Sequence, residues 1–257
     1  MKDVLLIFLF LFLLIGIVNA EEIHLLCLSF AQGDSIKFQQ QFAKIDSLKN
    51  QRNNFIIIST QKPEFINLEN FINIFSPEIF FEVSDTNIAK KDNRKIISSN
   101  LKFFNEEREI KFFHSEVIIL LDTLKIGIMG IVTPDFPHLY PELSKDLTFR
   151  FDIFNCAKEV VDSLRSQNTD IIISLNYLGN FLDKELIKKV PEIDFVIDYF
   201  ETNYEEYYIH NPKHINIIHI NFKQPSVIDI CLQLKKDTHN MLIIDSLSVK
   251  LDSNLSN

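Results

Sequence analysis

Two stretches decide the fold of this chain: KIGIMGIVTPD at residues 125–135 and DIIISLNYLG at residues 170–179. Each contains a short apolar run rich in isoleucine, which predicts a buried strand. The apolar residues between the two stretches recur at helical spacing: Phe154, Ala157, Val160, Val161 and Leu164. A strand, a helix and a second strand in this order are typical of a layered α/β domain.

The same alternation continues on both sides of this unit. Further strands are predicted at residues 23–29, 55–59, 79–83, 95–99, 110–114, 117–121 and 194–197, and as three runs between residues 215 and 251. Further helices are predicted at residues 36–51, 65–75 and 183–189. Two β-rich halves with helices outside them predict an α/β fold, a four-layer αββα sandwich of two mixed sheets flanked by helices.

The composition is that of a globular protein. The 257 residues are 46% hydrophobic and 24% charged, which excludes a disordered chain, and the net charge is −9. An acidic chain without a basic stripe is a poor partner for nucleic acid, so no nucleic-acid binding is expected. Only 5 glycines are present, which argues against loops that bring backbone N–H groups onto a phosphate.

The N-terminus indicates export. Residues 1–20 contain one lysine, an apolar run and a small-residue pattern ending at Ala20, all typical of a signal peptide. The alternative is an uncleaved membrane anchor, for which the apolar run is short. We therefore expect a periplasmic or extracellular protein with no transmembrane span in the mature chain.

The cysteines and histidines suggest no motif. Cys27, Cys156 and Cys231 match no zinc or redox spacing, so buried thiols are predicted, and a single disulfide with one remaining thiol is the alternative. His214 and His219 are an odd number of residues apart and face opposite sides of a strand. Each is expected to be a structural histidine.

The order of segments resembles the N-terminal domain of the 5'-nucleotidase family, within the calcineurin-like metallophosphoesterases. The resemblance extends from about residue 23 to residue 251. It rests on ISSNL (97–101), VPEIDFVI (190–197) and the two stretches quoted first. It implies that residues 21–257 form a single metallophosphoesterase-like domain, without the C-terminal substrate domain of the family.

The resemblance also implies that the metal-ligand motifs of the family are lost here. The first aspartate and histidine ligands of the family fall on Phe30 and Gln32, and its metal-bridging aspartate falls on Lys62. Its asparagine and catalytic histidine fall approximately on Ser84 and Asp85. Its remaining histidine ligands fall on Tyr177, Phe200 and Thr202.

Family members would hold two divalent ions such as Mn, Zn or Fe, but these residues are unsuitable ligands. Phenylalanine offers no ligand atom, and a lysine about 4 Å from a divalent ion is repelled by about 8 kcal/mol at an effective dielectric constant near 20. Lys62 either replaces a missing cation beside Asp85 or Glu201, or points to solvent. No cofactor, metal site or catalytic residue is therefore predicted.

Two functions remain open at this stage. The first is an exported, catalytically inactive metallophosphoesterase-like protein that acts as a binding or structural module for an envelope or protein partner. The alternative is a diverged phosphoesterase with a reduced or relocated metal site built from Asp85, Asn87, Asn176 and Glu201. One prediction is geometric: Phe30, Tyr177 and Phe200 should lie together and fill the former metal cavity.

Overall fold

The computed structural model describes a subset of the chain. The described residues are Ala43, Ile45, Ser47 and Leu48, all helical, and the segments 21–29, 54–59, 71–74, 96–103, 113–200, 207–210, 217–220, 226–238 and 241–252. The predicted signal peptide at residues 1–20 and the predicted strand at residues 79–83 lie outside these segments.

One sheet has seven strands in the order β15-β14-β1-β2-β3-β4-β6. Strands β1 to β6 in this sheet run parallel to one another, whereas β14 is antiparallel to both β1 and β15, so the sheet is mixed. The strands are β1 (Glu21–Ser29), β2 (Phe55–Ser59), β3 (Phe71–Ile74), β4 (Ile96–Ile97), β6 (Phe113–His114), β14 (Ser226–Lys236) and β15 (Leu242–Asp252).

The other large sheet has six strands in the order β12-β13-β11-β10-β8-β7. Its four central strands are parallel and its two edge strands are antiparallel to their neighbours, so this sheet is also mixed. The strands are β7 (Glu116–Leu121), β8 (Leu124–Val132), β10 (Ile171–Tyr177), β11 (Phe195–Asp198), β12 (Tyr207–His210) and β13 (Ile217–Ile220).

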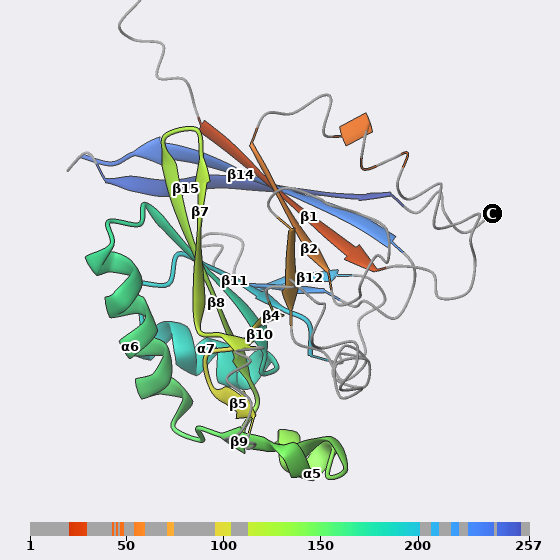
Figure 1. The fold of residues 1–257 in the computed structure, drawn as a ribbon. Helices are drawn as coiled ribbons and strands as arrows, with labels where there is room; N and C mark the ends of the chain where they lie inside the picture. The colour runs from red at the N-terminus through yellow and green to blue at the C-terminus, as the bar shows by residue number, and fades with distance from the viewer. Residues whose placement is uncertain are drawn as a thin grey trace, which may run out of the picture.

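Smaller elements complete the described structure. Strands β5 (Leu101–Phe103) and β9 (Leu147–Phe149) pair as a two-stranded sheet, near the short helix α5 (Phe136–Leu139) and the 3₁₀ helix Leu143–Asp146. The two longer helices, α6 (Ile153–Ser166) and α7 (Asn180–Lys189), connect β9 to β10 and β10 to β11 (Figure 1). The parallel neighbours β8 and β10 are thus joined across α6, and β10 and β11 across α7, as in βαβ units.

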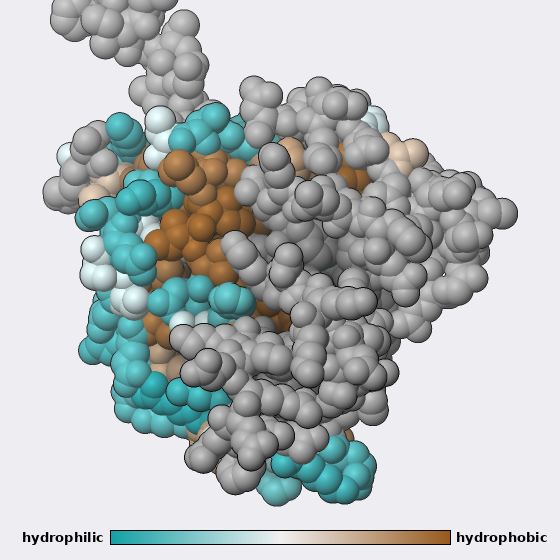
Figure 2. Space-filling view, viewed as in Figure 1, coloured by the Kyte–Doolittle hydropathy of each residue, from teal (hydrophilic) through white to brown (hydrophobic). Residues whose placement is uncertain are grey.

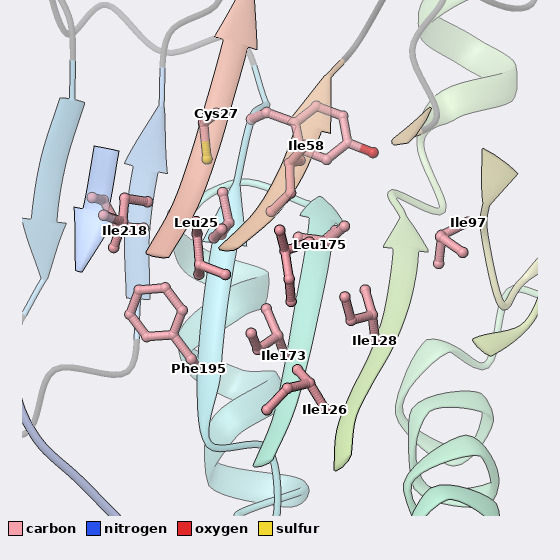
Figure 3. Close-up of a cluster of buried hydrophobic side chains, with 14 of the residues drawn as sticks. Leu25, Cys27, Ile58, Ile97, Ile126, Ile128, Ile173, Leu175, Phe195 and Ile218 are labelled. Atoms are coloured by element: carbon pink, nitrogen blue, oxygen red, sulfur yellow. The ribbon is translucent and has the colours of Figure 1, made fainter. Parts of the chain in front are cut away.

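The main core lies between the two large sheets. Leu25, Cys27 and Ile58 extend from the seven-stranded sheet toward Ile173 and Leu175 of the six-stranded sheet, and all five are fully buried (Figure 3). Alternate residues of each strand point into this space because side chains alternate across a strand. The two sheets are thus held together by apolar burial on their facing sides.

Helices cover the outer sides of both sheets. Ala157, Val161 and Leu164 of α6 pack on Met129 and other outward residues of the six-stranded sheet. On the far side, the helical residue Ile45 packs against Leu26, Leu28, Ile57 and Val227 of the seven-stranded sheet. The order helix, sheet, sheet, helix confirms the predicted αββα sandwich.

Most predicted strands and helices are present, but one prediction is wrong. Residues 71–74 form β3, whereas the sequence pattern predicted a helix over residues 65–75. The apolar residues Phe71, Ile72 and Ile74 fit a helical stripe and a short strand equally well, and pairing with β2 and β4 selects the strand. Residues 207–210 form β12, a strand for which the sequence pattern gave no prediction.

Several smaller expectations are also settled. Cys27, Cys156 and Cys231 are buried thiols, as predicted, so no disulfide joins them.

A side chain at Gly130 would bring Cβ within 2.9 Å of the Leu175 carbonyl oxygen and 3.0 Å of the Ile97 carbonyl oxygen, so only glycine permits this close approach of the backbones. None of the helices in the described segments is long and apolar enough to span a membrane. Figure 2 shows apolar side chains gathered as a band over the β7–β8 hairpin.

Candidate functional site

Three parallel strands end together at one edge of the six-stranded sheet. The pairing register places Asn176 of β10 beside Asp198 of β11, and Asp198 beside His219 of β13. Helix α7 begins directly after β10 and carries Asp183 in its first turn. Functional side chains of α/β proteins commonly gather at the carboxyl ends of parallel strands, so this edge is the candidate site.

Neighbouring residues at this edge point in opposite directions. Tyr177 and Tyr199 belong to the core between the two sheets. Asn176 and Asp198 precede them in the chain and therefore face the helix side of the same sheet. One edge thus presents two chemically different surfaces.

The surface between the sheets is aromatic. The ring centroids of Tyr177 and Phe200 are 4.9 Å apart, and those of Tyr177 and Tyr199 are 5.4 Å apart. The hydroxyl groups of Tyr177 and Tyr140 are hydrogen-bonded at 2.9 Å. Burial and the nearby Asp198 carboxylate raise the pKa of Tyr199, so its hydroxyl stays neutral. We call Tyr140, Tyr177, Tyr199 and Phe200 the aromatic cluster.

Part of the sequence-based geometry is confirmed here. Tyr177 and Phe200 are in ring contact, as expected of residues that fill one space. The other positions that the resemblance assigned to the family site lie outside the described residues: Phe30, Gln32, Lys62, Ser84, Asp85 and Thr202. Their roles stay predictions.

The aromatic cluster does not suit a pair of divalent ions. Two-metal hydrolysis needs carboxylate and imidazole ligands that hold two ions about 3.5–4 Å apart. Phe200 has no ligand atom, and the Tyr177 hydroxyl is hydrogen-bonded to Tyr140. The two described positions therefore do not fit the metals that the resemblance implies.

The helix side of the same edge is polar and fully enclosed. The Ser174 hydroxyl donates to Asn176 Oδ1 at 2.6 Å, and Asn176 Nδ2 donates to Asp183 Oδ1 at 2.8 Å. His219 Nδ1 lies 2.9 Å from Asp198 Oδ2. All five residues are at most 1% exposed. We call Ser174, Asn176, Asp183, Asp198 and His219 the polar cluster.

Asp198 is the main acceptor of the polar cluster. Its Oδ1 accepts from the backbone N–H groups of Leu178 and Gly179 at 3.1 and 3.3 Å, and from that of Phe200 at 3.4 Å. Gly179 has a φ of +84°, a conformation that favours glycine and turns its N–H toward this carboxylate. These hydrogen bonds hold the turn after β10 against the end of β11.

Asp183 is the carboxyl group of the polar cluster whose pKa is shifted. Burial, followed by the nearby Asp198 charge, raises the pKa of Asp183 well above its usual range. A neutral Asp183 beside an ionised Asp198 avoids the repulsion between two buried carboxylates. His219 then donates from Nδ1 to Asp198, because an ionised carboxylate only accepts.

The enclosure of the polar cluster limits its chemistry. Asp183, Asp198 and His219 have ligand atoms within 4.8 Å of one another, which is close enough for a metal ion. However, both Asp198 oxygens already accept hydrogen bonds, and none of the three side chains reaches solvent. The arrangement suits a network that positions the edge of the sheet better than it suits a substrate-binding centre.

The sequence identified this cluster incompletely. The sequence places Asn176 in the alternative relocated metal site, but its amide is hydrogen-bonded to Ser174 and Asp183 on the helix side. The other residues of that site, Asp85, Asn87 and Glu201, lie outside the described residues. His219 is a structural histidine, as expected. Asp183 and Asp198 were missed, although a charged residue at the end of an apolar strand such as FVID is a usable signal.

Comparisons with known proteins agree on the fold. No protein-family model matches the chain, and no curated protein matches its sequence. The solved structures include a calcineurin-like phosphoesterase from Bacillus subtilis, with 14% identity, a TM-score of 0.64, and coverage of 93% of this chain and 92% of that one. A putative 5'-nucleotidase from Staphylococcus aureus has 13% identity and a TM-score of 0.65, over 89% of this chain and 54% of its own.

A third solved structure is the NAD nucleotidase of Haemophilus influenzae, with 16% identity and a TM-score of 0.60. The match covers 92% of this chain and 59% of that one, so the chain spans only about half the length of both nucleotidases. These three structures and this chain share the arrangement of sheets and helices. The chain therefore has the fold of the calcineurin-like phosphoesterases and 5'-nucleotidases.

Proposed function

We propose that this protein is an exported protein that uses the phosphoesterase fold as a binding or structural module and does not perform two-metal hydrolysis. The observation that carries the proposal is the ring contact between Tyr177 and Phe200 at 4.9 Å. The resemblance places histidine ligands at these two positions. Aromatic rings in contact there occupy the space that ligands and metal would need.

The enclosed polar cluster supports the same function. Its carboxylates and imidazole are the residue types that hydrolysis uses, yet they are buried on the helix side and hydrogen-bonded to one another. A substrate phosphate cannot contact groups that are 0–1% exposed. We propose that these groups fix the ends of β10, β11 and β13, while a partner in the cell envelope binds elsewhere on the protein.

The decisive experiment measures hydrolysis by the purified protein. Nucleoside monophosphates and bis-p-nitrophenyl phosphate are offered with Mn²⁺, Zn²⁺ or Fe²⁺, and turnover is expected to equal that of buffer with the same metal. The matched controls are Asp85→Asn and Glu201→Gln, which alter the alternative relocated site. Metal-dependent turnover that these variants abolish would contradict the proposal and establish the diverged hydrolase.

Export is tested separately by the mass of the protein recovered from the culture medium or periplasm. A mature chain that begins at Glu21 is expected, because the small-residue pattern ends at Ala20. A membrane-bound chain that keeps Met1 would instead identify the N-terminus as an anchor.

A further inference from the structure

A second group of metal-ligand residues lies on the seven-stranded sheet, away from both clusters. Glu22 and His24 of β1 and Cys231 of β14 have ligand atoms within 4.8 Å of one another. We propose that these three residues bind one zinc ion. The site is independent of the phosphoesterase-like edge and of the proposed function.

Strand register brings the three residues to one face. Glu22 and His24 are two residues apart on β1, so both point to the same side of the sheet. Cys231 is directly opposite His24 in the antiparallel pairing of β1 with β14. Leu26 and Val227 continue this face and pack with Ile45, which identifies it as the outer face of the sheet.

A buried carboxylate orients the imidazole. Asp229 Oδ1 lies 3.1 Å from His24 Nδ1, and the Asp229 side chain is only 6% exposed. Because a carboxylate accepts and does not donate, the proton of His24 resides on Nδ1, and Nε2 is the nitrogen that can bind metal. Histidine ligands of zinc commonly have such a carboxylate behind them.

The distances and donor types suit zinc. His24 Nε2 and Glu22 Oε2 are 3.6 Å apart. Tetrahedral zinc, with bonds of about 2.0–2.3 Å to oxygen, nitrogen and sulfur, requires ligand atoms roughly 3.3–3.6 Å apart. A set of thiolate, imidazole and carboxylate favours zinc over magnesium or calcium, which prefer oxygen ligands alone.

Access to the site comes through Glu22. Its side chain is 47% exposed, whereas that of His24 is 10% exposed. An ion can therefore reach the Glu22 carboxylate from solvent and keep a water molecule as its fourth ligand. His24 and Cys231 would bind it from the buried side. Such an ion would join β1 to β14, and because it binds only the folded chain it would stabilise the sheet.

The test uses the full-length purified protein with zinc and then cobalt as the probes. One zinc per chain is expected from elemental analysis after dialysis. Co²⁺ is expected to give a thiolate-to-cobalt charge-transfer absorption, which reports the Cys231 bond whether or not the protein hydrolyses anything. Cys231→Ser should lose this absorption, and the matched control Cys156→Ser should keep it.

Two further variants separate ligation from folding. Glu22→Gln changes an exposed side chain, so the protein should stay folded and bind zinc more weakly. Asp229→Asn should weaken zinc binding by about 10–100-fold, as expected for loss of the carboxylate that orients the histidine. Cobalt binding without a thiolate band, or unchanged zinc affinity in folded Glu22→Gln, would overturn this site. Hydrolytic turnover is scored separately and contradicts only the proposed function.

Discussion

The two surfaces at the carboxyl edge of the six-stranded sheet differ although they share the same strands. Between the sheets, the aromatic cluster packs by ring contact and one hydroxyl pair. On the helix side, the polar cluster is held by hydrogen bonds to Asp198 and Asp183. Because successive side chains of a strand point to opposite faces, Asn176 belongs to the polar cluster and its neighbour Tyr177 to the aromatic cluster.

The two clusters stabilise the protein in different ways. Aromatic burial depends on area removed from water and is insensitive to pH. The stability of a buried polar network depends on every hydrogen bond in it. A buried donor or acceptor that loses its hydrogen-bond partner has no water molecule to replace it. At this end of the sheet, the loss of one polar atom is therefore expected to cost less in the aromatic cluster than in the polar cluster.

The largest expected effect breaks the polar cluster. Asp198→Ala removes the acceptor of three backbone N–H groups and of His219, and should lower the free energy of unfolding by about 3–5 kcal/mol. Urea denaturation followed by circular dichroism measures the change. Asp198→Asn, which keeps one acceptor oxygen, is the control and should lose less. A loss below about 1 kcal/mol in Asp198→Ala would mean that the network is not holding this edge.

The next effect concerns pH. The pKa of Asp183 is about 4 in the unfolded chain and is raised in the folded protein. At pH values between these two pKa values, Asp183 is protonated in the folded protein and ionised in the unfolded chain. The contribution of Asp183 to stability is therefore complete below about pH 4 and falls as pH rises, by at most about 1.4 kcal/mol per pH unit.

Asp183→Asn removes this titration while keeping an oxygen that can accept from Asn176. The free energy of unfolding of Asp183→Asn relative to the unsubstituted protein should therefore rise between pH 4 and pH 7. Parallel stability curves for the two proteins would show that Asp183 is ionised in the fold, contrary to the arrangement inferred for the polar cluster. The charge that faces Asp183 is that of the Asp198 carboxylate.

The smallest effect belongs to the aromatic cluster. Tyr177→Phe removes the hydroxyl bonded to Tyr140 but keeps the ring, and should lower the free energy of unfolding by about 0.5–1 kcal/mol. Tyr140→Phe and the double variant complete a cycle that isolates the hydroxyl pair. If Tyr177→Phe lowered the free energy of unfolding as much as Asp198→Ala does, the two clusters would not differ in their sensitivity to the loss of a polar group.

Much of the fold follows from local sequence pattern. The apolar runs within residues 125–135 and 170–179 form the strands β8 and β10, and α6 lies between them, because apolar runs and helical stripes are local signals. The pattern failed at residues 71–74, where a short apolar run satisfies both periods and only neighbouring strands decide. The contact of Tyr177 with Phe200 followed from the resemblance, which supplied long-range information that periodicity lacks.

The sequence by itself determined most strands and helices of the described segments, the buried faces and the acidic character of this protein. Only the tertiary structure decided that Asp183, Asp198 and His219 meet, and that His24 lies opposite Cys231. The reason is physical: hydrogen-bond register between strands distant in the chain is fixed by packing of the whole sheet, and no local period records which residues become neighbours.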